Sequence, residues 1–175
     1  LRAFEKVLSH RNSLLKSWPI DHAVLKSFTD LYIREAAQVI YYRTKALHEL
    51  QNYFATQSTL ILGPNNHTSL SYSCGEETID TWSVGDISGY LLNRYRHYEK
   101  QELYRKVSLF GPHLDSIDFF INGLNAQKCA SRGQSRALII AFKLAQILAI
   151  IHYRNHTPII ILDDIVSELD EEKKR

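Results

Sequence analysis

Two adjacent carboxylates, Asp163 and Asp164, offer the clearest chemistry in the sequence. They follow Ile159–Leu162, a short apolar run rich in β-branched residues, which predicts a fully buried strand of a parallel sheet. Open α/β sheets bind ligands outside the carboxyl ends of their strands. Carboxylate oxygens at that edge suit Mg²⁺, which usually arrives with the phosphates of a nucleotide. From this strand alone, a metal site and the plain end of a strand are equally good interpretations.

A second polar group, Ser131-Arg132-Gly133-Gln134, precedes a helix that the sequence predicts from Ser135 to about His152. The hydroxyl of Ser131 and the free backbone N–H groups near Gly133 would bind an anion, which the helix dipole also favours. Glycine lets a phosphate approach the backbone closely. An ordinary N-cap is the alternative interpretation. Together with the later acids, the group favours phosphoryl transfer: Asp163 would hold Mg²⁺, and Asp164 would position or activate the attacking water.

Long helices must position these groups. The helix after Gln134 is apolar nearly all round, which predicts that it is buried inside the domain. Residues 2–17 have a helical pattern that Trp18-Pro19 ends, because proline disfavours the helical state of the residue before it. Asp21 is a candidate cap for a longer helix that continues to Phe54 with apolar residues at helical spacing. The two helices predict an αα-hairpin.

The middle of the chain predicts strands around a further helix. Ser69–Cys74 alternates as a strand does, and Asp86 can cap a helix over about Ile87–Lys106. Further strands are predicted at Val107–Phe110, Ile117–Ile121 and Leu124–Cys129, the last two joined by an Asn122-Gly123 hairpin turn.

The helix over about Ile87–Lys106 carries a basic surface, which could contact a nucleic-acid backbone, although a solvated charged face is the commoner reason for such a pattern. Its basic residues are Arg94, Arg96, Lys100, Arg105 and Lys106.

Composition narrows the class of protein. The 175 residues are 45% hydrophobic and carry a net charge of +2, so bulk charge does not decide the partner. Cys74 and Cys129 have no accompanying histidines at zinc-site spacing, which favours a reducing compartment. We expect a cytoplasmic protein without a membrane span. None of the seven glycines begins GxxxxGK[ST], so the sequence holds half of an ATPase site, and we expect a fragment of a longer protein.

Several of these motifs together resemble the RecF family of DNA replication and repair ATPases. Ser131–Gln134, Ala141–Gln146, Ile161–Asp164 and Ser167–Asp170 are similar to the family's signature, following helix, Walker B strand and D-loop. Two earlier motifs add to the resemblance, because Arg11-Asn12-Ser13-Leu14-Leu15-Lys16 resembles R-N-x-L-L-K and Gly111-Pro112-His113 resembles G-P-H. The matches extend from residue 11 to residue 170. One departure is Leu114, which follows G-P-H where relatives usually carry arginine.

The resemblance implies an α/β fold, mostly helical here: part of an ABC-type, SMC-like ATPase head with an inserted helical arm, lobe II. Residues 1–129 would form the arm with a small β portion, and residues 130–175 the C-terminal part of the head. It implies ATP and Mg²⁺ as cofactors and an ATP-dependent homodimer. The signature residues Ser131, Arg132, Gly133 and Gln134 would contact in trans the nucleotide held by the other subunit's P-loop. Asp163 would serve the metal, Asp164 catalysis, and Ser167 and Asp170 the D-loop.

The family's partners follow from the same resemblance. They are double-stranded or gapped DNA at gaps and stalled forks, and mediator proteins of the RecO and RecR families. We further expect a role in the SOS response. Two other interpretations stay open: a non-catalytic DNA- or protein-binding module, and an SMC-like ATPase fragment not dedicated to DNA repair. We expect no ATP hydrolysis from these 175 residues alone, because they contain no P-loop.

Overall fold

The computed structural model describes residues 1–154 and 157–159. The chain divides into two compact units that alternate along the sequence. Unit 1 comprises Leu1–Ala46 and Tyr72–Ser116, and unit 2 comprises Leu47–Ser71 and the described residues from Ile117 onward. These units are defined by compactness alone. The predicted division into an arm of residues 1–129 and a head portion of residues 130–175 concerns functional parts and stays a prediction.

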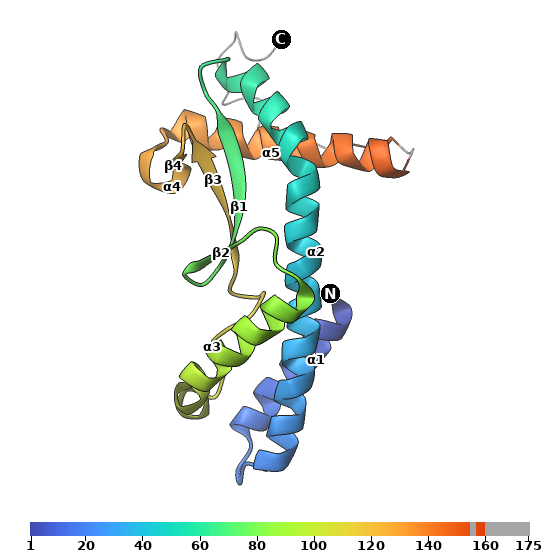
Figure 1. Ribbon diagram of the computed structural model, residues 1–175, viewed down its shortest axis with the longest axis vertical. Helices are drawn as coiled ribbons and strands as arrows, with labels where there is room; N and C mark the ends of the chain where they lie inside the picture. The colour runs from blue at the N-terminus through green and yellow to red at the C-terminus, as the bar shows by residue number, and fades with distance from the viewer. Residues whose placement is uncertain (155–156, 160–175) are drawn as a thin grey trace. The chain divides into compact units, whose positions relative to one another are not determined.

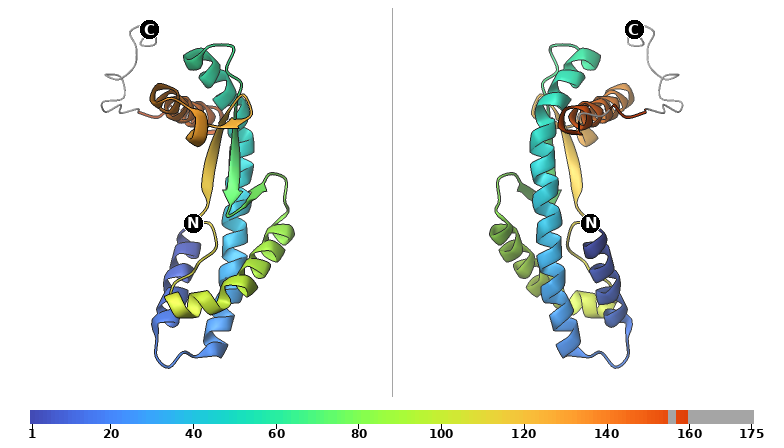
Figure 2. Two further views of the ribbon diagram at one scale, coloured as in Figure 1. Left: turned by 90° about the vertical axis from the view of Figure 1, so that its left-hand side faces the viewer. Right: turned by 90° about the vertical axis from the view of Figure 1, so that its right-hand side faces the viewer.

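Helices α1 (Arg2–Lys16) and α2 (His22–Leu62) confirm the predicted αα-hairpin (Figure 1). They run antiparallel from a short turn in unit 1, as both side views show (Figure 2). Asp21 caps α2 as predicted, because its Oδ1 accepts two backbone N–H groups of the first turn, each at 3.0 Å. With 41 residues, α2 contributes its first part to unit 1 and the remainder to unit 2.

Helix α3 (Val84–Arg105) begins earlier than the sequence predicts. Ser83 is its N-cap, and the Ser83 hydroxyl accepts the backbone N–H of Asp86 at 3.2 Å. The Asp86 carboxylate in turn accepts the backbone N–H of Ser83 at 2.9 Å, which completes a capping box. The prediction of Asp86 as the cap is therefore wrong, since Asp86 occupies the third helical position of that box. The helix ends at Arg105, and its C-cap residue Lys106 has a left-handed φ of 56°.

In the part of the chain that the structure describes, the strands form a four-stranded sheet in the order β2-β1-β3-β4. The first pair, β1 (Thr68–Cys74) and β2 (Glu77–Ile79), is antiparallel, with Cys74 opposite Glu77. The second pair, β3 (Ser116–Ile121) and β4 (Leu124–Asn125), is also antiparallel. The predicted strands at residues 69–74 and 117–121 are thus confirmed.

The β3–β4 hairpin has the predicted turn but a shorter return. Asn122 and Gly123 have φ values of 51° and 78°, and a two-residue turn of type I′ requires positive φ at both positions. The predicted return strand over Leu124–Cys129 is wrong beyond Asn125. The Asn125 side chain caps the short helix α4 (Ala126–Cys129) by accepting a backbone N–H at 2.9 Å, so the chain turns helical there.

The predicted strand Val107–Phe110 is also wrong. This segment is irregular, and it pairs with no strand in the described part of the chain. Its largely apolar composition gave the prediction, but side chains from α1, α2 and α3 bond its backbone groups where a neighbouring strand would otherwise do so.

The core of unit 2 lies where the second part of α2, the strand β3 and the helix α5 (Arg132–Arg154) meet. The rings of Phe54, Phe119 and Phe142 pack edge to face, with centroids 5.5 to 6.3 Å apart. Ala141 and Ala145 are fully buried beside them. These alanines allow α5 to approach closely.

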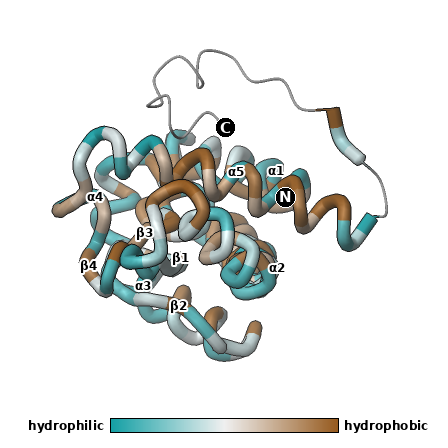
Figure 3. The backbone as a smooth tube through the Cα atoms, turned by 90° about the horizontal axis from the view of Figure 1, so that it is seen from above, coloured by the Kyte–Doolittle hydropathy of each residue, from teal (hydrophilic) through white to brown (hydrophobic). Residues whose placement is uncertain are grey.

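Helix α5 is not buried all round, so the prediction of an enclosed helix is wrong for the described residues. The helix is hydrophobic along much of its length (Figure 3), and its buried side consists mainly of small residues, whereas several large apolar residues on the other sides are exposed. They are Ile139, Leu148, Ile150 and Ile151. By length and composition α5 is also the one described helix that could cross a membrane, a test that the core helices of soluble proteins pass as well.

Candidate functional site

The predicted anion-binding group lies at the N-terminus of α5, as expected. The helix begins at Arg132, so Arg132, Gly133 and Gln134 occupy its first turn rather than a loop. The Ser131 hydroxyl accepts the backbone N–H of Gln134 at 3.2 Å, and the Gln134 side-chain oxygen accepts the backbone N–H of Ser131 at 2.9 Å. This capping box satisfies two backbone donors. The N–H groups of Arg132 and Gly133 have no acceptor within the helix.

Space around Gly133 is open. A Cβ added there would meet only the Ser131 Oγ, at 4.0 Å, and neither the fold nor a positive φ requires glycine at this position. Ser131, Arg132 and Gly133 are all exposed. An anion can therefore reach the two N–H groups, where the partial positive charge of the helix end and the Arg132 guanidinium favour it. These residues fit the terminal phosphate of a nucleotide.

The predicted acids lie outside the described residues. This applies to Asp163, Asp164, Ser167 and Asp170, and also to the strand that would present them. Within the residues that the structure describes, no three His, Cys, Asp or Glu side chains gather in a way that could hold a metal ion. The structure therefore brings together Ser131–Gln134, and the metal and catalytic assignments stay predictions.

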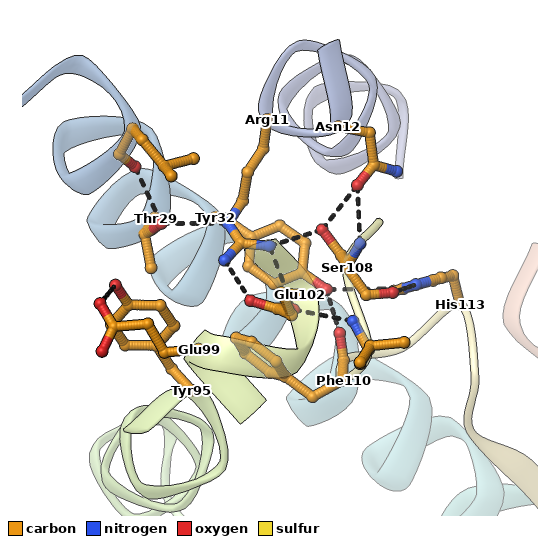
Figure 4. A network of polar contacts seen from close by, with 12 residues as sticks. Arg11, Asn12, Thr29, Tyr32, Tyr95, Glu99, Glu102, Ser108, Phe110 and His113 are labelled. Atoms are coloured by element: carbon orange, nitrogen blue, oxygen red, sulfur yellow. Dashed lines mark hydrogen bonds and ion pairs between the residues drawn. The ribbon is translucent and has the colours of Figure 1, made fainter. Parts of the chain in front are cut away.

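The R-N-x-L-L-K motif builds a buried polar cluster in unit 1 (Figure 4). Arg11 of α1 is fully buried and pairs with Glu102 of α3, which is 1% exposed. The two guanidinium nitrogens donate to the two carboxylate oxygens at 2.6 and 3.3 Å, while Arg11 also donates to Thr29 at 3.0 Å and to Ser108 at 2.6 Å. Such bidentate, fully hydrogen-bonded geometry compensates the cost of burying two charges.

Aromatic rings enclose the same guanidinium. The Cζ atom of Arg11 lies 5.1 Å from the ring centroid of Tyr32, 5.7 Å from that of Phe110 and 5.8 Å from that of Tyr95. Cation–π attraction adds to the ion pair, since both act in a site from which water is excluded. Burial also raises the pKa of the Tyr95 hydroxyl to about 12. All three nitrogens of the Arg11 side chain thus donate hydrogen bonds inside the protein, which indicates a structural role for this residue.

The cluster extends to the segment before G-P-H and holds its backbone. Asn12 accepts the backbone N–H of Ser108 at 2.8 Å, and Glu102 accepts that of Leu109 at 2.7 Å. The Tyr32 hydroxyl donates to the carbonyl of Phe110. Each contact replaces a bond that a β-ladder would have provided.

The glycine of G-P-H has a structural reason. Gly111 has a φ of 112°, and a Cβ there would overlap the hydroxyl oxygen of Tyr32. Leu114, which stands where relatives usually carry arginine, is 58% exposed. An arginine at that position would point to solvent and would contribute nothing to this core. The departure from the family pattern therefore leaves the packing of the loop intact.

Beyond the loop lies a second, half-buried polar group. Tyr72 of β1 donates to Asp115 at 2.7 Å and accepts from Arg43 at 3.3 Å, while Arg43 also donates to the carbonyl of Pro112. Burial raises the pKa of the Asp115 carboxyl above its usual value, although bonds from Tyr72 oppose that shift. Burial lowers the pKa of the neighbouring His113, which favours its neutral form.

Sequence reasoning missed Glu102 and Tyr32 as members of this cluster. A signal for Glu102 was present, because it continues the spacing of Leu91, Tyr95 and Tyr98 and so places an acid on the apolar side of α3. A buried acid of that kind needs a cation. Tyr32 gave no comparable signal, since a tyrosine on an apolar helix face is ordinary.

The chain is similar to known proteins in sequence and in fold. No protein-family model matches the chain. The chain is 30% identical to the DNA replication and repair protein RecF of Bacillus cereus, over 98% of this chain and 47% of the relative. RecF of Bacillus velezensis is 31% identical with the same coverage. A solved structure of the recombination mediator protein RecF with ATP, from the RecFOR pathway, superposes with a TM-score of 0.86 and 26% identity, over 99% of this chain and 47% of that chain.

The fold is therefore the mixed, mostly helical α/β fold that the sequence predicts, and it matches part of an ABC-type ATPase. The chain spans about half the length of the curated relatives it matches. Over that half, the chain is similar in sequence and in fold to RecF, a protein of DNA replication and repair.

Proposed function

We propose that the chain supplies the signature and Walker B half of an ATP-dependent DNA repair and recombination protein of the RecF kind. The observation that carries the proposal is the open, capped N-terminus of α5. There an S-R-G-Q sequence presents unpaired N–H groups in a chain that superposes on RecF with ATP at a TM-score of 0.86. An exposed helix N-terminus with an unconstrained glycine is suited to a phosphate rather than to packing.

In this proposal Ser131, Arg132, Gly133 and Gln134 contact the terminal phosphate of an ATP molecule held by a second subunit. The backbone N–H groups of Arg132 and Gly133 donate to the phosphate oxygens, and the Ser131 hydroxyl retains a proton that it can donate. Gln134 keeps the turn in place through the capping box. A site of this kind closes only when two subunits meet, so ATP promotes a homodimer.

Asp163 and Asp164 would complete the proposed site from the strand that the sequence predicts after α5. Asp163 would hold Mg²⁺, whose charge neutralises phosphate oxygens when it is bound, and carboxylate oxygens are the hard donors that this ion prefers. Asp164 orients the attacking water and accepts its proton. Ser167 and Asp170 belong to the D-loop in the same proposal.

The partners of the intact protein follow from its family. We expect double-stranded or gapped DNA as the substrate on which it acts, mediator proteins of the RecO and RecR families as partners, and the cytoplasm as its location. The solved relative bears the description of a recombination mediator of the RecFOR pathway.

The decisive experiment compares Asp164→Asn with the unaltered residue in the intact protein, measured as ATP turnover with and without duplex DNA. We expect turnover to fall strongly while ATP binding stays nearly unchanged, because only the positioning of water is lost. Glu76→Gln, an exposed acid in the β1–β2 turn, is the control and should leave turnover unchanged. Unchanged turnover in Asp164→Asn would refute the assignment.

The same measurement separates the proposal from a non-catalytic binding module. A protein that binds duplex DNA but shows no turnover that depends on Asp164 would be such a module. The 175 residues alone should bind nucleotide weakly and hydrolyse none, because they contain no P-loop. Clear turnover by these residues in isolation would contradict that reasoning.

A further inference from the structure

The basic surface of α3 is smaller and better defined than its sequence indicates. Arg94 is not free, because its Cζ lies 4.8 Å from the ring centroid of Tyr98 and 6.0 Å from that of Tyr90. It also donates to the Tyr98 hydroxyl at 3.2 Å. Arg94 therefore packs against α3 itself. Lys106 ends the helix in a left-handed conformation and does not extend the helical surface.

Apart from Arg105, which is also exposed, what remains is a continuous polar stripe along the outer side of α3. Its members follow one another at helical spacing and are all exposed, and Tyr104 at its end is 88% exposed. The stripe consists of Asn93, Arg96, His97, Lys100 and Tyr104. Arg96 donates to the Asn93 side-chain oxygen at 3.4 Å, a bond that does not use the amide N–H groups of Asn93.

No acid belongs to this stripe, although the same stretch of helix carries two. Glu102 is buried beneath Arg11. Glu99 lies on a flank of the stripe, where its carboxylate accepts the Tyr95 hydroxyl at 2.7 Å. The outer side of α3 thus presents cations, an amide, an imidazole and a phenol, all of which can donate hydrogen bonds.

We infer that this stripe is a contact surface for the phosphate backbone of duplex DNA. The inference rests on the proposed function and gives its DNA contact a place on the chain. Exposed cations spaced one turn apart match a row of phosphates, and contacts to phosphate carry no information on base sequence. The contact is accordingly independent of DNA sequence and sensitive to salt.

The test measures the affinity of the 175-residue chain for a duplex oligonucleotide as a function of salt concentration. The variant is Arg96→Ala with Lys100→Ala. The control is Arg2→Ala with Lys6→Ala, which removes the same charge from exposed positions of α1 in the same unit. Because the variant no longer neutralises two phosphates, the slope of log affinity against log salt should decrease by about 1.8. The fall in affinity between 50 and 200 mM salt then shrinks by about twelvefold, and the control keeps the original slope.

Three outcomes overturn the inference: no binding of duplex by the unaltered chain, an unchanged slope in the α3 variant, or equal changes in variant and control. Tyr104→Ala gives a further arm, since a large loss on single strands with no change on duplex would indicate stacking on bases and also overturn it. Circular dichroism establishes that each variant is folded. The ATP turnover of the Asp164→Asn variant tests the proposed function separately, so the DNA contact surface and the proposed function can each fail alone.

Discussion

The Arg11 cluster of unit 1 and the N-terminus of α5 in unit 2 both contain residues that the family resemblance singles out, but their chemistry is opposite. Arg11 is fully buried, and its guanidinium is bonded to Glu102, Thr29 and Ser108. At α5, Gly133 is exposed with open space around it. A family motif therefore marks either packing or ligand contact, and burial together with hydrogen-bond satisfaction distinguishes the two.

The strongest way to break this comparison is Arg11→Leu. The change leaves the Glu102 charge buried without a partner, so we expect the free energy of unfolding to fall by about 3 to 5 kcal/mol. Chemical denaturation followed by circular dichroism measures it. Lys6→Leu, on the exposed side of α1, is the matched control and should change stability by less than about 0.5 kcal/mol. Arg11→Leu with Glu102→Leu should regain much of the loss, and a double variant as unstable as the single one would argue against an ion-pair origin.

Gly111→Ala and Gly133→Ala provide a second contrast. The added methyl at Gly111 overlaps the Tyr32 hydroxyl, and the alanine backbone must adopt a positive φ. We therefore expect the free energy of unfolding to fall by about 2 to 4 kcal/mol. At Gly133 the same methyl meets open space in a helical turn, and stability should stay equal or rise by about 0.5 to 1 kcal/mol. Thermal unfolding of the two variants side by side decides the matter. Equal destabilisation would mean that Gly133 is structural.

Ser131→Ala tests the cap alone. Removing the hydroxyl leaves the Gln134 N–H without its acceptor, for which we expect a loss of about 1 kcal/mol. Ser131→Asn should retain most of the stability, because asparagine is also a good N-cap. Denaturant midpoints of both variants provide the measurement. No loss in Ser131→Ala would show that the capping box contributes nothing to the fold.

The smallest expected effect concerns pH. The pKa of His113 is lower in the folded chain than its ordinary value of 6.5, so the unfolded chain binds more protons below that value. The contribution of His113 to stability is complete above pH 6.5 and declines as pH falls through 6.5 toward the folded pKa. His113→Gln should flatten this part of the profile of stability against pH. Asp115, whose folded pKa is raised, acts in the opposite direction at lower pH, and Asp115→Asn serves as the comparison.

Local sequence patterns predicted most of the fold, because most of its elements depend on residues that are close together in the sequence. The helix spacing, the Asp21 cap and the Asn122-Gly123 turn each depend on a few neighbouring residues. Two of the errors, the strand at Val107–Phe110 and the burial of α5, occurred where other elements of the fold decide. Val107–Phe110 has the composition of a strand, but Asn12, 96 positions away, and Glu102, on the preceding helix, take up its backbone donors. The burial of α5 was overestimated because hydrophobicity does not specify what covers a helix.

The site divides in the same way. The Ser131–Gln134 group was predicted from its local chemistry, and its position at a helix N-terminus is confirmed. The pairing of Arg11 with Glu102 joins residues 91 positions apart, and no local pattern encodes such a contact. Residue types alone indicate that a buried charge needs a partner, but only the fold identifies it.

The side-chain bonds to residues 108–110 have a consequence for how this protein can change in evolution. A β-ladder tolerates almost any side chain, since main-chain atoms make its bonds. Here the conformation of the loop depends on the identities of Asn12, Tyr32 and Glu102, which lie on three different helices. Substitutions at these positions should therefore occur together or not at all, while the exposed residues beside them vary freely.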